Sequence, residues 1–209
     1  MAEFLELAPA ELGALLCSRV CHDIISPVGA INNGLELLAE CEGDEGAMDL
    51  ITTSAANASS RLQFCRIAYG ASGSATADID TGDAQQVTEA YMASEKPEFK
   101  WTGTPALMPK NRVKLFMNLI LIANASIPRG GSLDATIADN AGATQFTLKS
   151  AGRLMRVPQK FQDFMDGRFG EEGVDAHSVQ FYYTLLLARD VGMKIAISVS
   201  EEAITYTAA

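Results

Sequence analysis

The sequence predicts a helical hairpin followed by an α/β sandwich in a chain of 209 residues. Two long stretches near the N-terminus repeat apolar residues at steps of three and four, which is the period of an amphipathic α-helix. The remainder mixes helical runs with β-rich runs, as in a mixed sheet that carries helices on one face. A lone hairpin buries little surface. We therefore expect a homodimer in which two hairpins pair as a four-helix bundle through residues 9–70.

The first helix is predicted over residues 9–40. Pro9 suits a first turn, where no helical hydrogen bond is lost. The polar stretch CEGDEG ends the pattern, and Asp44 can cap the next helix. A long apolar stripe on one face is predicted to lie in the bundle. The stripe consists of Leu12, Leu16, Val20, Ile24, Val28, Ile31, Leu35 and Leu38.

The second helix is predicted over residues 45–69. Its small and apolar residues alternate steps of four and three, which indicates a heptad seam. The loop between the two helices is short, so they are expected to run antiparallel. The seam residues are Ile51, Ala55, Ala58, Leu62, Cys65 and Tyr69.

Residues 70–83 are small and polar and are predicted as a linker. The domain boundary falls within it, giving a helical domain over 1–73 and an α/β domain over 74–209. In the second domain, helices are expected over 83–94, 111–126, 158–167 and 176–192. Strands are expected over 98–103, 133–139, 144–152, 193–200 and 203–208.

Charge and composition narrow the class of protein. The formal net charge of −10 argues against general binding to nucleic acid or to an anionic membrane. The N-terminus lacks a basic leader, and the run LFMNLILIANASI is too short to span a bilayer, so a cytoplasmic protein is expected. The four cysteines lack a C-x-x-C spacing, so we interpret them as buried reduced thiols and expect no metal site.

His22, one of the two histidines, is predicted to lie on the face of the first helix that points away from the bundle. At about 100° per residue, His22 falls about 180° from the part of the stripe formed by Val20, Ile24, Ile31, Leu35 and Leu38. Arg19 lies on one flank of it and Ile25 on the other. Small or polar residues share its face, which leaves room for another protein to approach. These residues are Ser18, Ser26, Gly29, Asn33 and Glu36.

This placement suits a nucleophile, because a neutral imidazole nitrogen attacks readily near neutral pH. Asp23 could accept a hydrogen bond from one ring nitrogen and leave the other free, and Arg19 could pair with a phosphoryl oxygen or an acid on a partner. The alternatives are that His22 is a solvated surface histidine without a role, that Asp23 is an ordinary surface acid, and that Arg19 is a solvated basic residue. Pro27 is expected to kink the helix beside the histidine. The second histidine, His177, is interpreted as a surface or capping residue.

The segment HDIISPVGAI resembles the H box of sensor histidine kinases, H-[ED]-x-x-[TS]-P-x-x-x-[IL]. His22, Asp23, Ser26, Pro27 and Ile31 match that pattern. The resemblance implies a dimerisation-and-phosphotransfer domain followed by an ATPase-like domain of the Bergerat fold.

The second domain departs from the kinase pattern at the nucleotide motifs. The N box keeps Asn118 but has Ile122 where a magnesium-ligating asparagine would stand. The stretch SAGRL has Ser150 in place of the adenine-reading aspartate and Leu154 in place of a glycine. No G-x-G-L-G stretch precedes the last long helix, although IPRGG at 127–131 resembles a family turn. These departures imply a degenerate domain that does not bind ATP.

A kinase-like body with an intact H box and degenerate nucleotide motifs is similar to the ChpT-type histidine phosphotransferases of bacterial cell-cycle phosphorelays. The resemblance implies that His22 takes a phosphoryl group from the receiver of a CckA-type hybrid histidine kinase. It would pass the group to receivers of CtrA-type and CpdR-type response regulators. The receiver would carry the magnesium ion, so this chain needs no cofactor of its own.

The candidate residues fall into two groups. The candidate catalytic residues are His22, Asp23, Ser26 and Arg19. The candidate partner-binding residues are Ile25, Gly29, Asn33, Arg61 and Arg66. Two alternatives stay open: an atypical ATP-dependent sensor histidine kinase, and a non-enzymatic dimeric adaptor that docks receivers.

Overall fold

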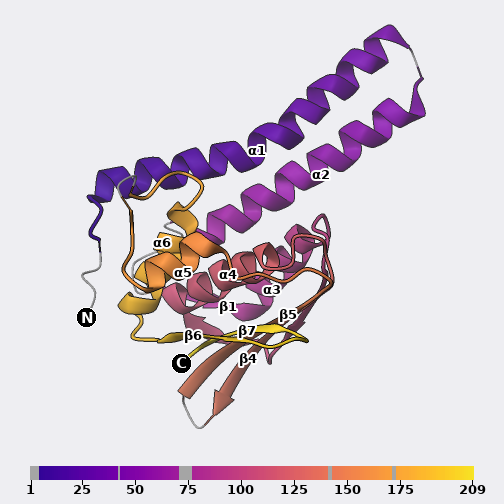
Figure 1. Ribbon diagram of the computed structural model, residues 1–209. Helices are drawn as coiled ribbons and strands as arrows, with labels where there is room; N and C mark the ends of the chain where they lie inside the picture. Colours follow the sequence, from indigo (N-terminus) through magenta and orange to yellow (C-terminus); the bar gives the residue numbers. More distant parts are fainter. Residues whose placement is uncertain (1–4, 42, 71–76, 141–142, 171–172) are drawn as a thin grey trace.

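The computed structural model describes residues 5–41, 43–70, 77–140, 143–170 and 173–209. Helices α1 (Pro9–Glu40) and α2 (Glu45–Ala68) form an antiparallel hairpin that projects from the rest of the molecule (Figure 1). The Asp44 side chain accepts a hydrogen bond from the backbone nitrogen of Ala47 at 3.1 Å and so caps α2. The predicted hairpin is confirmed, with α2 ending one residue earlier than expected.

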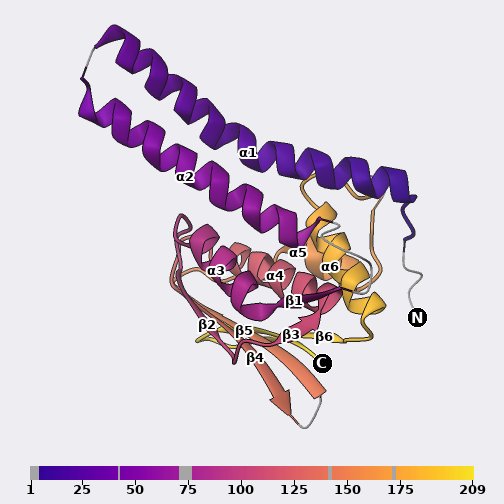
Figure 2. The same cartoon turned by 180° about the vertical axis from the view of Figure 1, so that it is seen from behind.

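Helix α1 changes direction near its middle, and Pro27 lies in this part of the helix (Figures 1 and 2). A proline inside a helix removes one hydrogen bond of the ladder, which permits a bend. The N-terminal half of α1 lies over the second domain, where Leu12 and Leu16 pack against its core. The other half extends away together with α2. The bend thus places the middle of α1 at the edge of the second domain.

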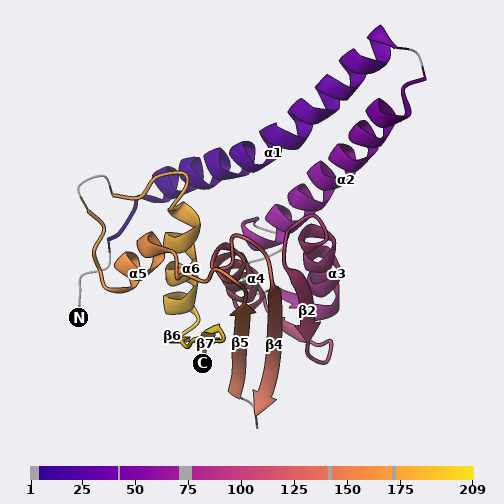
Figure 3. The same ribbon diagram turned by 45° about the vertical axis from the view of Figure 1, so that its right-hand side comes forward.

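The second domain contains a five-stranded mixed sheet in the order β2-β4-β5-β7-β6. The β2–β4 pair is parallel, and the other pairs are antiparallel. The helices cover one face of this sheet (Figure 3), as the sequence predicts. The strands are β2 (Glu98–Thr102), β4 (Ser132–Asn140), β5 (Ala143–Ala151), β6 (Ile195–Val199) and β7 (Ile204–Ala208). The helices are α3 (Thr81–Met92), α4 (Lys110–Ala125), α5 (Gln159–Met165) and α6 (Val179–Asp190).

The linker prediction over 70–83 is partly wrong. Residues 71–76, which contain the predicted domain boundary, lie outside the described residues. Beyond them the chain forms β1 (Asp78–Asp80), which pairs antiparallel with β3 (Leu107–Pro109), and then enters α3. Strands of three residues are too short to show a clear alternation in the sequence.

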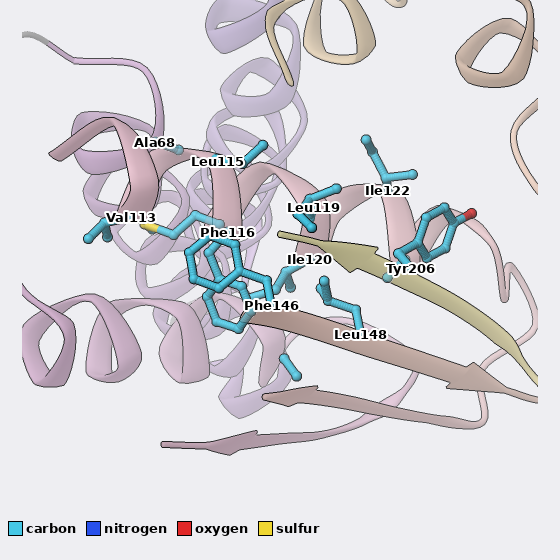
Figure 4. Close-up of a cluster of buried hydrophobic side chains, with 14 of the residues drawn as sticks. Ala68, Val113, Leu115, Phe116, Leu119, Ile120, Ile122, Phe146, Leu148 and Tyr206 are labelled. Atoms are coloured by element: carbon cyan, nitrogen blue, oxygen red, sulfur yellow. The ribbon is translucent and has the colours of Figure 1, made fainter. Parts of the chain in front are cut away.

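Helix α4 is the centre of the core (Figure 4). Leu115, Phe116, Leu119 and Ile120 on this helix are fully buried. The Phe116 ring lies 4.8 Å from the ring of Phe146 on β5, measured between centroids. Because α4 has the sheet on one side and other helices on the other, it is apolar around most of its circumference.

Glycine is required where β4 begins. Gly131 has a φ of 137°, and a Cβ there would collide with the carbonyl oxygen of Ala151. Gly130, with a φ of 85°, approaches the backbone of Lys96. The two glycines let the turn before β4 pass close to the end of β5. This turn is the IPRGG stretch at residues 127–131.

Helix α1 is long and apolar enough to cross a bilayer, by length and composition alone. This length of apolar helix differs from the expectation that the run LFMNLILIANASI in α4 is the longest apolar stretch. One such helix is weak support for a membrane span. Here Leu12 and Leu16 of α1 pack against the second domain.

Candidate active site

His22 lies near the middle of α1 with 61% of its side chain exposed. Ser26, one turn further along, is also exposed, and Ile25 is 71% exposed. Apart from the neighbouring residues and backbone of its own helix, no atom of the described residues lies within 4 Å of the position that a Cβ on Gly29 would occupy. The outward placement that the helical wheel predicts is therefore present, and a partner can reach the imidazole over a surface of small residues and one apolar side chain.

Asp23 lies beside one nitrogen of the imidazole. The Nδ1 atom of His22 is 3.4 Å from Oδ1 of Asp23. The other carboxylate oxygen, Oδ2, accepts a hydrogen bond from Nε of Arg19 at 2.9 Å. A carboxylate beside Nδ1 favours the tautomer with its proton there, which leaves the lone pair on Nε2 free.

Arg19 is occupied within the chain. Besides its bond to Asp23, its Nη1 donates to the carbonyl oxygen of His177 at 3.3 Å. Burial lowers the pKa of Arg19, but the charge of Asp23 more than compensates and the pKa is raised, so the guanidinium stays charged. The predicted role of Arg19 toward a partner's acid or phosphoryl group remains untested, and this geometry makes it a support for the site.

His177 lies against the candidate nucleophile, which the sequence did not predict. The centroids of its ring and of the His22 ring are 5.0 Å apart, and the ring planes meet at 82°. His177 is exposed, as predicted, but the N-cap position of α6 belongs to Ser178. A single histidine far along the chain gives no sequence signal that it will meet another.

The two arginines predicted on α2 have different surroundings. Arg61 donates to Oε1 of Glu95 at 2.7 Å, and its guanidinium lies 5.1 Å from the centroid of the Tyr91 ring. It therefore joins α2 to the second domain. Arg66 is exposed and lines a shallow groove between α1 and α2 that includes Leu16. Asn33 is exposed on the outer half of α1.

The residues at the positions of the kinase nucleotide motifs pack inside the second domain. Ile122 and Ser150 are fully buried, and the Ser150 hydroxyl donates to the carbonyl oxygen of Ala123 at 2.9 Å. The Asn118 amide nitrogen donates to the carbonyl oxygen of Ala68 at 3.2 Å, which joins α4 to the end of α2. Oδ1 of Asn118 has no hydrogen-bond partner among the described residues. One buried amide oxygen beside an aliphatic side chain does not fit a magnesium–nucleotide site.

A hollow of about 640 Å³ lies at the C-terminal end of α4, where Ala125 lines it. Residues 156–160 and the start of α6 form its walls, including His177 and Phe181. Arg156 and Lys160 give it a basic rim. Within the described ranges, no cluster of three or more histidine, cysteine or carboxylate groups could hold a metal ion.

The reading of the cysteines as buried thiols is largely wrong. Cys17, Cys21 and Cys41 are exposed, and only Cys65 is buried. Burial raises the pKa of the Cys65 thiol to about 11, which keeps it protonated. The exposed cysteines lie on or next to the hairpin, where the sequence pattern suggested more cover than a single chain provides.

Comparisons with known proteins identify the family. The model of the histidine phosphotransferase C-terminal domain matches residues 81–203. The protein phosphotransferase ChpT of Brucella abortus (strain 2308) is 58% identical over 202 residues, covering 97% of each chain. The chain belongs to the family of ChpT-type histidine phosphotransferases. It is accordingly a phosphotransferase, as the H box predicts.

Solved structures agree with this assignment. This phosphotransferase is similar to a structure described as a bacterial phosphotransferase, with a TM-score of 0.93 and 55% identity over 99% of each chain. It also resembles the histidine kinase domain of the blue-light activated kinase EL346 from Erythrobacter litoralis. That likeness has a TM-score of 0.51 and 12% identity, covering 85% of this chain and 93% of the other. The second likeness shows the histidine-kinase fold alone.

Proposed function

We propose that this phosphotransferase carries a phosphoryl group on Nε2 of His22 and shuttles it between receiver aspartates. The exposed imidazole, with a carboxylate at its other nitrogen, is the observation that carries this proposal. Nε2 attacks the phosphorus of an aspartyl phosphate, the new N–P bond forms, and the aspartate leaves as a carboxylate. The ring then bears positive charge, which the Asp23 carboxylate stabilises. The reverse steps pass the group on.

The donor in this proposal is the receiver of a CckA-type hybrid histidine kinase. The acceptors are receivers of CtrA-type and CpdR-type regulators in a bacterial cell-cycle phosphorelay. The name of the Brucella relative supports phosphotransfer, and the resemblance to ChpT-type phosphotransferases is what suggests this particular relay. Magnesium would arrive with the receiver, where it can neutralise the phosphoryl oxygens.

The second domain is proposed not to bind ATP. Supporting this are the buried Ile122 and the buried hydroxyl of Ser150, which is committed to the backbone of α4. The hollow of about 640 Å³ that Arg156 and Lys160 help to line favours the alternative of an atypical kinase. A thermal-shift titration with magnesium and ATP tests the point, and a saturable stabilisation would support the kinase alternative.

Receiver docking is proposed on the outer face of α1. Ile25 supplies the apolar contact beside the histidine, while Ser26 and Gly29 let the partner approach closely. Asn33 extends the same face. A small interface of this kind suits a transient complex. Arg66 remains a candidate contact, whereas Arg61 is a weaker one because it already pairs with Glu95.

The homodimer is proposed on the apolar seam of the hairpin. Val28, Leu35 and Leu62 belong to the predicted seam and are 42%, 53% and 49% exposed in the single chain. A second hairpin would cover them and complete a four-helix bundle. We propose a cytoplasmic protein on the same basis, since the apolar surface of α1 is then buried by a partner helix instead of lipid.

The decisive experiment follows a labelled phosphoryl group. The protein is incubated with a phosphorylated receiver, and acid-labile label on this chain is measured over time. We expect transfer to the wild-type chain and none to His22→Ala, with the circular dichroism melt unchanged. If His22→Ala still accepts the group, the proposed site is wrong. If neither protein accepts it but both bind the receiver, the adaptor alternative is supported.

A further inference from the structure

Two contacts bear on the orientation of the His22 imidazole, one within α1 and one with the second domain. One is the carboxylate of Asp23, at 3.4 Å from Nδ1. The other is the ring of His177, in an edge arrangement with centroids 5.0 Å apart. The first contact is long for a hydrogen bond and holds the ring only weakly. The ring contact is the larger restriction on how the imidazole can turn.

His177 is held in place by its own surroundings. The carboxylate of Asp175 accepts hydrogen bonds from the backbone nitrogen of Ser178 at 2.7 Å and from its hydroxyl at 2.6 Å. Lys160 pairs with the same carboxylate at 3.1 Å. Arg19 then donates to the carbonyl oxygen of His177 at 3.3 Å. The ring therefore sits on a braced turn that is tied to α1.

We propose that His177 is a positioning residue for phosphotransfer, which rests on the proposed role of His22 as phosphoacceptor. A side chain that is 61% exposed on a helix would otherwise exchange between staggered rotamers. Packing against the His177 ring favours the rotamer in which Nδ1 stays beside Asp23 and Nε2 stays accessible. Holding a nucleophile near its reactive geometry removes entropy that the transition state would otherwise lose.

The proposal gives the degenerate domain a specific task. Arg19 contacts both supports of the imidazole, because it pairs with Asp23 and holds the backbone of His177. The second domain thus supplies one wall of the site without using a nucleotide. His22 is presented correctly only while the turn before α6 rests on α1.

Rate measurements with two variants test this role. We expect His177→Ala to slow phosphoryl transfer to His22 by roughly two- to tenfold, the range that the loss of one ring pair corresponds to. His177→Phe keeps a ring and should restore most of the rate. Gln159→Ala, an exposed change at the wall of the nearby hollow, is the matched control and should leave the rate unchanged. A wild-type rate in His177→Ala would overturn the proposal.

Imidazole NMR gives a readout that a general loss of stability would not produce. The chain has two histidines, so its spectrum contains signals from His22 and His177 only. We expect a through-space cross-peak between the two rings, and χ1 couplings of His22 that become averaged in His177→Ala but not in His177→Phe. Absence of the cross-peak in the wild type would contradict the contact.

Two further outcomes distinguish a failure of the positioning role of His177 from a failure of the proposed role of His22 as phosphoacceptor. Label that persists in His22→Ala would defeat the proposed function, whereas label on His22 with unchanged kinetics in His177→Ala would defeat only the role of His177. His177→Lys introduces a cation without a ring. A better rescue by lysine than by phenylalanine would overturn positioning by ring packing.

Discussion

Arg19 and Asp23 lie one helical turn apart on α1 and form an ion pair with 2.9 Å between Nε and Oδ2. Their side chains are only 24% and 18% exposed, and Arg19 also donates a hydrogen bond to the carbonyl oxygen of His177 in the second domain. The remaining carboxylate oxygen of Asp23 faces His22. The acid beside the imidazole is therefore itself paired with a cation.

The first prediction concerns Asp23→Asn. We expect transfer to His22 to slow roughly tenfold, which corresponds to about 1.4 kcal/mol, because the amide stabilises a charged ring less well than a carboxylate. Stopped assays with a phosphorylated receiver measure this rate. Asp163→Asn removes the partner of an exposed arginine, Arg168, and serves as the control. Equal rates in both variants would argue against the role of Asp23.

The second prediction concerns docking beside His22. Ile25→Glu should weaken receiver binding by roughly tenfold or more, since a charge would replace the apolar contact at the proposed centre of the interface. Leu107→Glu is matched to it, because Leu107 is 73% exposed but lies on β3, away from α1. Titration calorimetry with the receiver compares the two variants. Equal losses of affinity would place the docking face elsewhere.

The third prediction concerns the homodimer. A carboxylate in place of Leu35 would be buried without a partner in the four-helix bundle, so Leu35→Asp should yield monomers. Light scattering should then report the mass of one chain, in contrast to twice that mass for the wild type. Leu154→Asp alters an exposed leucine of the second domain and should remain dimeric. A monomeric wild type would exclude the proposed bundle.

The fourth prediction follows from a buried lysine on α4. Burial, together with the nearby charge of Lys110, lowers the pKa of Lys114 to about 8 from its ordinary value of 10.5. Below pH 8 both folded and unfolded chains carry the charge, and the folded state bears the full cost of burying it. Between pH 8 and 10.5 the folded state loses the proton first, so this group's contribution to stability improves as pH rises.

Lys114→Met should therefore raise the free energy of unfolding at pH 7 by an amount on the order of 1 kcal/mol, with a smaller gain near pH 10. Urea unfolding at both pH values measures the change. Lys149→Met removes the same charge from an exposed position on β5 and should show no such dependence. A gain that does not vary with pH would mean that folding leaves the pKa of Lys114 unchanged.

Local patterns were enough to predict much of the molecule. The 3.6-residue period located α1 and α2, and the same period placed His22 opposite the apolar stripe. The long strands and helices of the second domain were likewise predicted near their observed bounds. The short strands β1 and β3 were missed, because three residues show too little alternation and their pairing is decided by the chain around them.

The amino-acid sequence by itself determined the hairpin, the outward histidine and the degenerate nucleotide motifs, because each depends on residues close together in the chain. Only the tertiary structure decided the neighbours of those residues. Arg19 meets the carbonyl oxygen of His177 across 158 positions, and Arg61 meets Glu95 across 34. Such contacts depend on how the second domain packs on the hairpin, and no local period encodes that packing.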